Sequence, residues 1–79
     1  MKIEIRLFAA FRDYLPPGCG SYSFERFYNN ETTVGDVIRE LRLPEHLAKI
    51  ILVNGAAAET DRVLGDKDVL SIFPLIGGG

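Results

Sequence analysis

The sequence contains one cysteine and one histidine among 79 residues. A single cysteine excludes an internal disulfide framework. Cys19 lies in a turn-forming stretch of prolines and glycines at residues 16–20, and no histidine is placed to pair with it. Cys19 and His46 also lack metal-ligand spacing to each other or to a carboxylate cluster. We therefore expect no metal site, and we interpret Cys19 as a loop residue without a chemical role.

An excess of basic residues and a long apolar run are also missing. The 9 Lys and Arg residues are interspersed among 11 Asp and Glu residues, for a net charge of −2. This pattern provides no basic stripe for nucleic acid and no polybasic membrane signal. The longest apolar stretch, residues 69–76, is far too short to cross a bilayer, and the first residues predict a strand, not a signal peptide. We expect a cytoplasmic protein with no nucleic-acid or membrane partner.

The composition is that of a globular protein, with 47% hydrophobic and 25% charged residues. This length suits one domain near the lower limit for a self-sufficient core. No internal repeat or linker interrupts the chain, and the only low-complexity segment is the run of glycines at its end. We predict one domain over residues 1–76 and a flexible glycine tail over residues 77–79.

The first half of the chain predicts two strands and two helices. Residues 1–8 alternate between apolar and charged side chains, which is typical of a half-buried strand. Residues 9–15 suit a short helix that Pro16 and Pro17 end, and the aromatic-rich residues 21–28 predict a second strand. Thr33 and Asp36 have the spacing of a helix cap. An apolar stripe at helical spacing then predicts the main helix, with exposed charges opposite the stripe at Arg39, Glu40 and Arg42.

The second half predicts three strands. Residues 44–49 suit one further helical turn, and the apolar run at residues 50–53 predicts a buried strand. Asn54 and Gly55 favour a tight reverse turn, so residues 56–58 should return as a short strand. The last strand begins at Val69. A hairpin, a crossover helix and further strands, with the first and last strands side by side, describe an α+β fold: a β-grasp with a mixed sheet, one main helix and one short helix.

Strand periodicity places two aromatic residues on the face of the sheet opposite the helix. If Leu7 and Ile72 face the helix, then Phe8 and Phe73 face away from it on neighbouring strands. An exposed apolar patch of this kind usually marks an interface. The alternative is that Phe8 lies beyond the strand and packs into the core with Phe11. We favour the exposed patch.

The chain ends in three glycines, Gly77, Gly78 and Gly79. Glycine has no Cβ and accepts most backbone conformations, so this segment would fit a channel too narrow for side chains. Extended residues 74–79 would carry a terminal carboxylate roughly 20 Å beyond the last paired strand residue. Pro74, which cannot donate a ladder hydrogen bond, would end the pairing. The other interpretation of the glycines alone is an idle chain end.

The chain resembles the ubiquitin-like sulfur carriers of the MoaD/ThiS family over nearly its whole length. The family's first strand and short helix are matched by residues 6–15, the start of its main helix by residues 33–36 and its hairpin by residues 53–55. Residues 64–69 are similar to its turn into the last strand, and residues 73–79 to its ending. Gly77 stands where molybdopterin-type members usually have Thr or Ala, while Gly78 and Gly79 match the functional pair.

The resemblance implies a carrier and not an enzyme. An adenylating enzyme of the ubiquitin E1 type would use ATP and Mg²⁺ to activate the Gly79 carboxylate, and a persulfide or sulfide donor would convert it to a thiocarboxylate. Gly77 and Gly78 would form the narrow entry into the partner, and Phe8 and Phe73 would correspond to family aromatics on the partner-binding face. Leu75 and Ile76 would add docking contacts. The carrier itself would bind no cofactor.

The sulfur acceptor is left open by the resemblance. It would be an enzyme such as a molybdopterin synthase large subunit or a thiazole synthase, and the ending Phe73 and Pro74 favours the molybdenum cofactor pathway over thiamine biosynthesis. A competing interpretation is a ubiquitin-like modifier that forms isopeptide bonds through Gly79. A third is a non-catalytic β-grasp binding module with an idle tail.

Overall fold

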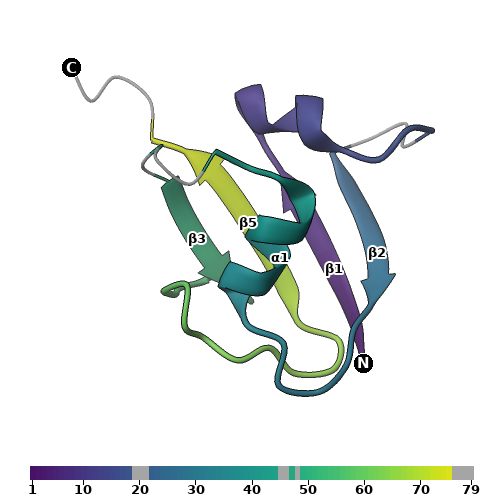
Figure 1. Cartoon of the computed structure of the whole chain (residues 1–79). Helices are drawn as coiled ribbons and strands as arrows, with labels where there is room; N and C mark the ends of the chain where they lie inside the picture. Colours follow the sequence, from purple (N-terminus) through teal and green to yellow (C-terminus); the bar gives the residue numbers. More distant parts are fainter. Residues whose placement is uncertain (19–21, 45–46, 48, 76–79) are drawn as a thin grey trace.

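The computed structural model describes residues 1–18, 22–44, 47 and 49–75. It shows a five-stranded mixed sheet with one α-helix lying across one face (Figure 1). In chain order the elements are β1 (Lys2–Leu7), the 3₁₀ helix η1 (Ala9–Tyr14), β2 (Ser23–Phe27), α1 (Val34–Leu41), β3 (Lys49–Val53), β4 (Ala56–Ala57) and β5 (Val69–Pro74).

The strand order in the sheet is β2-β1-β5-β3-β4. β1 and β2 are antiparallel, β1 and β5 are parallel, and β3 runs antiparallel to both β5 and β4. The first and last strands are therefore neighbours at the centre of the sheet, as the sequence predicted. This arrangement confirms the predicted α+β fold of the β-grasp type, with one main helix and one short helix.

The core lies between α1 and the central strands. In β1 the alternating residues Ile3, Ile5 and Leu7 are fully buried. The parallel register sets Ile5 beside Leu70 and Leu7 beside Ile72, and both β5 residues are fully buried as well. Opposed residues on neighbouring strands share a face, so this register aligns one apolar face beneath the helix.

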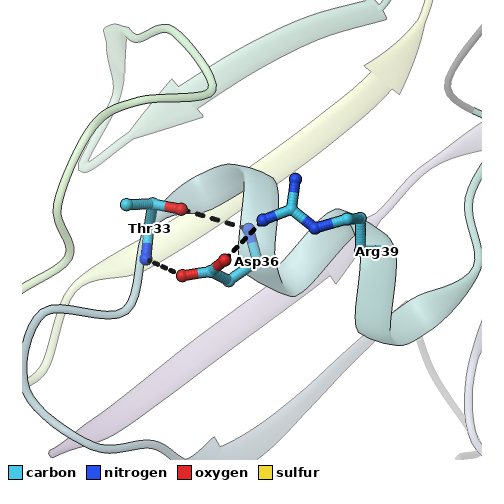
Figure 2. A network of polar contacts seen from close by, with 3 residues as sticks. All are labelled: Thr33, Asp36 and Arg39. Atoms are coloured by element: carbon cyan, nitrogen blue, oxygen red, sulfur yellow. Dashed lines mark hydrogen bonds and ion pairs between the residues drawn. The ribbon is translucent and has the colours of Figure 1, made fainter.

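The start of α1 is fixed by a capping box. The backbone N–H of Asp36 donates to Thr33 Oγ1 at 3.2 Å, and the Thr33 N–H donates to Asp36 Oδ2 at 2.9 Å. Figure 2 shows the two residues facing each other across the first turn, with Arg39 reaching back to Asp36 from the next turn. These bonds satisfy two backbone groups that a helix start would leave without partners.

The predicted apolar stripe of α1 is confirmed. Val34, Val37, Ile38 and Leu41 are all buried, while Arg39, Glu40 and Arg42 are exposed. The helix ends at Leu41 because Arg42 adopts a left-handed conformation, with φ of 61°. The part of the chain that the structure describes contains no helix long and apolar enough to cross a membrane.

The strand β3 differs from its prediction. The apolar run at residues 50–53 was expected to be buried throughout, but only Ile51 and Val53 are buried, and Ile50 is 45% exposed. The reason is that α1 covers one face of the sheet and alternate residues of β3 point to the other. In the predicted helical turn over residues 44–49, the described residues show one backbone bond, from the Leu47 N–H to the Pro44 carbonyl at 3.3 Å. Lys49 belongs to β3, and its Nζ donates to the Pro44 and Leu47 carbonyls.

The predicted turn between β3 and β4 is confirmed. Asn54 and Gly55 have φ of 53° and 84°, the left-handed values that a two-residue hairpin turn requires. The Asn54 side chain also spans to the start of β5: its Nδ2 donates to Asp68 Oδ1, and its Oδ1 accepts from the Val69 N–H, both at 2.9 Å. This turn therefore helps to hold β3 beside β5.

Candidate functional site

The candidate site is an aromatic patch that consists of Phe8, Tyr22 and Phe73. Leu7, the last residue of β1, is buried, and Phe8 continues the extended backbone with φ of −122° and ψ of 157°. Successive side chains of an extended chain point to opposite faces, so Phe8 lies on the face away from α1. Ala9 then takes a positive φ of 52°, and the chain turns into η1.

Backbone hydrogen bonds hold the patch from both sides of β1. The Phe8 N–H donates to the Ile72 carbonyl at 3.2 Å, which ties Phe8 to β5 one residue before Phe73. The Leu7 N–H donates to the Tyr22 carbonyl at 2.9 Å, which ties the chain before β2 to the same point. Three segments that are distant in sequence therefore deliver one aromatic residue each.

The rings pack against one another. The Phe8 and Phe73 ring centroids are 4.2 Å apart with 5° between the ring planes, and the Tyr22 ring lies 5.2 Å from Phe8. Stacking contributes about 0.5–1.5 kcal/mol beyond area burial. Phe8 and Phe73 are half-buried, and Tyr22 is 44% exposed. The patch is thus an ordered apolar surface that still has area to bury against a partner.

Two aliphatic side chains lie beside the aromatic patch. Ile50 opposes Phe73 in the register of β3 and β5, which places both on the open face. Leu75 follows Pro74, the last residue of β5, and is 54% exposed. The apolar surface therefore extends from β1 to β3 at the end of the sheet where β5 ends.

A charge pair occupies the same face further along β1. Arg6 Nε donates to Glu4 Oε2 at 2.5 Å, and this hydrogen bond raises the pKa of Arg6 above its usual value. Because the two charges are opposite, they give the open face no strong sign beside the aromatic patch. Among the described residues, the aromatic patch itself therefore offers apolar contact to a partner.

The structure brings together the two aromatic residues that the sequence predicted. Phe8 stacks on Phe73 and does not pack into the core with Phe11, so the predicted placement of both rings on the open face is confirmed. Their partner-binding role stays a prediction. Leu75 is exposed next to the patch. Ile76, Gly77, Gly78 and Gly79 lie outside the described residues, and their roles stay predictions. Cys19 and His46 also lie outside them.

Sequence reasoning missed Tyr22 and Ile50. Tyr22 lies two residues before Phe24 and just before β2 begins. The bond from the Leu7 N–H to the Tyr22 carbonyl holds this part of the chain beside the end of β1, where the Tyr22 ring meets Phe8. Ile50 was hidden in an uninterrupted apolar run, where alternation gives no signal. Ile50 would have been identified by aligning this run with the last strand, because alternate residues of the two strands share a face. Within the described ranges, no group of three or more His, Cys, Asp or Glu side chains could hold a metal ion.

Comparison with known proteins identifies the family. The family model described as Mut7-C ubiquitin matches residues 1–77. No curated protein sequence matches the chain. Among solved structures, the HVO 2177 protein of Haloferax volcanii is similar at 31% identity and a TM-score of 0.80, over 100% of this chain and 87% of that one.

Two further solved structures carry functional names. One is the Pyrococcus furiosus protein named "Putative molybdopterin converting factor, subunit 1", with 28% identity and a TM-score of 0.72 over 92% of this chain and 95% of that one. The other is small archaeal modifier protein 1 of H. volcanii, with 25% identity and a TM-score of 0.70 over the same shares. The match over residues 1–77 and these likenesses confirm the resemblance stated from the sequence: the chain belongs to the Mut7-C ubiquitin family and is a ubiquitin-like protein of the MoaD/ThiS type.

Proposed function

We propose that this protein is a sulfur carrier whose Gly79 carboxylate is adenylated and converted to a thiocarboxylate. One observation carries the proposal: the stacked Phe8 and Phe73 rings form an apolar surface at the end of β5, directly before the residues that lead to the terminal glycines, and we take this surface as the docking site. A partner that covered the aromatic patch would meet Leu75 next. The likeness to a molybdopterin converting factor subunit 1 supports the same role.

The activation of the Gly79 carboxylate has two steps. A carboxylate is a poor electrophile because its leaving group would be oxide, so its oxygen first attacks the α-phosphorus of Mg²⁺-ATP and pyrophosphate leaves. Hydrosulfide then attacks the acyl carbon, the bond to AMP breaks, and a thiocarboxylate remains. The E1-like adenylating partner supplies the metal ion and the positive charge that stabilise both transition states. The chain contributes its terminus and its docking surface, and it is not itself the enzyme.

The acceptor we favour is a molybdopterin synthase large subunit. The support is the likeness to the protein named as a putative subunit 1 of a molybdopterin converting factor. A thiazole synthase in thiamine biosynthesis is the other acceptor that the same tail chemistry would serve. Both reactions depend on ATP-driven activation, and we place them in the cytoplasm.

The test is intact mass after incubation with a cognate adenylating enzyme, Mg²⁺-ATP and a sulfide donor. We expect the mass gain of one sulfur-for-oxygen exchange, located at Gly79 by fragmentation. Deleting Gly79 should abolish the gain while circular dichroism shows an unchanged fold. If the intact protein gains no mass with an enzyme that is competent on another carrier, the carrier proposal is wrong.

A second candidate function is a protein modifier, which the likeness to small archaeal modifier protein 1 favours. It would use the same adenylate, but a lysine amine would replace sulfide as the nucleophile. Conjugates of higher mass that contain a Gly79 isopeptide bond would demonstrate it in lysate. Full function after removal of Gly78 and Gly79 would instead indicate a non-catalytic binding module.

A further inference from the structure

The strand β2 is the last strand on its side of the sheet. In the described chain its one strand neighbour is β1, and its outer side forms the sheet edge at the right of Figure 1. An edge strand presents a row of backbone donors and acceptors, which an extended chain can pair with. β2 is therefore a candidate for strand addition.

The register identifies the backbone groups that point outward. Met1 and Tyr28 exchange two hydrogen bonds, at 2.8 and 2.9 Å, and the Leu7 N–H donates to the Tyr22 carbonyl. In an antiparallel pair the inward-bonded residues alternate. Tyr22, Phe24, Arg26 and Tyr28 thus bond toward β1. The N–H and C=O groups of Glu25 and Phe27 therefore point away from it.

The side chains along this edge favour a positively charged residue on an added strand. Glu25 lies directly opposite Glu4 on the open face, and like charges in directly opposed positions repel each other. Glu4 is compensated by its hydrogen bond from Arg6. Glu25 has a looser contact, to Lys2 Nζ at 3.6 Å, and its side chain is 57% exposed. A strand added beyond β2 would place its own residue beside Glu25, and a cation there would relieve the repulsion.

The same edge carries an exposed aromatic anchor. Phe27 is 77% exposed and lies between two shallow hollows, one lined by Lys2 and Asp66 and the other by Tyr28 and Glu40. An apolar side chain opposite Phe27 would cover the ring, because opposed residues of paired strands share a face. On the helix side, Arg26 is already engaged by Glu40 at 2.8 Å and lies 5.1 Å from the Phe24 ring.

A second copy of the chain fits this edge poorly. Two symmetric antiparallel registers pair the outward groups of both copies. One is centred on Glu25 and sets Glu25 against the partner's Glu25, and the other is centred on Arg26 and sets Arg26 against the partner's Arg26. This repulsion is of the kind that natural edge strands use against self-association. The charge at the centre of the edge therefore selects a basic foreign segment over another β2.

We propose that β2 binds an extended peptide segment of a partner protein, antiparallel to β2, with a lysine or arginine opposite Glu25 and an apolar side chain opposite Phe27. The main-chain groups of Glu25 and Phe27 would form up to four hydrogen bonds to the segment. Phe27 lies at the opposite end of β2 from Tyr22 of the aromatic patch. The site is thus separate from the surface used in the proposed sulfur transfer.

The test is a titration of the ¹⁵N-labelled full-length protein with two blocked peptides, followed by amide chemical shifts. The first peptide is Ile-Glu-Lys-Val-Thr, with its lysine opposite Glu25 and its isoleucine opposite Phe27. The second replaces the lysine by glutamate. We expect the Glu25 and Phe27 amides to shift with the lysine peptide at concentrations on the order of millimolar, and the glutamate peptide to bind about tenfold more weakly.

Three variants sharpen the test. Glu25→Lys should reverse the preference between the two peptides, which a general loss of structure would not do. Phe27→Ser should weaken both peptides, whereas Phe73→Ser in the aromatic patch should leave both unchanged. The proposal is overturned if the two peptides bind equally, if the shifts appear at the aromatic patch instead of at β2, or if the free protein dimerises through β2. Thiocarboxylate formation on Glu25→Lys should be normal. The outcome of the peptide titration is therefore independent of the proposed sulfur-carrier function.

Discussion

Both faces of the sheet carry apolar side chains, but those on one face are buried in the core and those on the other remain partly accessible. Ile72 and Phe73 are neighbours on β5, yet Ile72 is fully buried beneath α1, and Phe73 remains half-buried on the open face. Likewise Leu7 is buried and Phe8 is not. One residue along a strand decides whether an apolar side chain stabilises the fold or stays accessible to a partner.

The difference between the faces comes from the single helix. α1 covers one face with a stripe of four apolar residues and is anchored by its capping box. Among the described residues, no helix covers the other face (Figure 1). That face is divided between charged pairs on β1 and β2 and the aromatic patch. The comparison predicts that substitutions on the two faces separate stability from partner binding.

The largest effect is expected on the helix face. Ile72→Ala removes a fully buried side chain and should lower the free energy of unfolding by about 2–5 kcal/mol. Because a small domain has only about 5 kcal/mol or somewhat more in total, much of the variant would be unfolded. Urea unfolding followed by circular dichroism measures the loss. A change below about 1 kcal/mol would contradict the assignment of this face to the core.

The neighbouring substitution on the open face should have the opposite profile. Phe73→Ser loses ring stacking, worth about 1 kcal/mol of stability. The variant should lose about 2 kcal/mol or more of its interaction free energy with the adenylating partner. This loss would appear as roughly a thirtyfold fall in kcat/KM for thiocarboxylate formation. The matched control is Phe27→Ser, an exposed phenylalanine outside the aromatic patch, which should keep normal kinetics. Equal losses in both variants would defeat the docking role.

A smaller effect is expected at the helix cap. Thr33→Ala removes the hydroxyl that accepts the Asp36 N–H and should cost about 1 kcal/mol of unfolding free energy. Thr33→Ser keeps the hydroxyl and should recover most of it. Both values come from urea unfolding. The aromatic patch lies on the other face, so the Phe8 and Phe73 ring signals in NMR spectra should be unchanged. A shift of those signals would mean that the two faces are not independent.

The smallest effect is a pH dependence on the helix face. Hydrogen bonds from Thr33, with a further contribution from Arg39, lower the pKa of the Asp36 carboxyl below its usual 3.8. The charged carboxylate therefore adds stability that is complete above the unfolded-state pKa and is lost as pH falls through the lower folded-state pKa. Urea midpoints between pH 6 and about pH 2 should fall less steeply in Asp36→Asn than in the parent protein. Identical slopes would show that the cap is not coupled to this charge.

Much of the fold was predictable because its signals are local. The alternation in β1, the spacing of Thr33 and Asp36 and the left-handed preference of Asn54 and Gly55 all act within a few residues. Phe8 and Phe73 were predictable for the same reason, since each follows a residue that must face the core. The predicted strand over residues 21–28 was right in kind, but its bounds shortened to Ser23–Phe27.

What failed depended on pairing between distant segments. The run at residues 50–53 contains no polar residue to mark its exposed positions, so the exposure of Ile50 follows only from its register against β5. Tyr22 has no local property that separates it from Phe24, and its place beside Phe8 depends on a bond from β1 to the chain before β2. The charge conflict between Glu4 and Glu25 likewise exists only once β2 is paired with β1.

The sequence by itself therefore determined the hydrophobic periodicity and several boundaries: which residues alternate, where the main helix begins, where the chain reverses, and where β5 ends. Tertiary structure decided which apolar side chains meet, because only strand pairing and the position of α1 choose between two faces of equal periodicity. The Phe8 and Phe73 stack, its extension to Tyr22 and Ile50, and the outward edge of β2 all arise at that level.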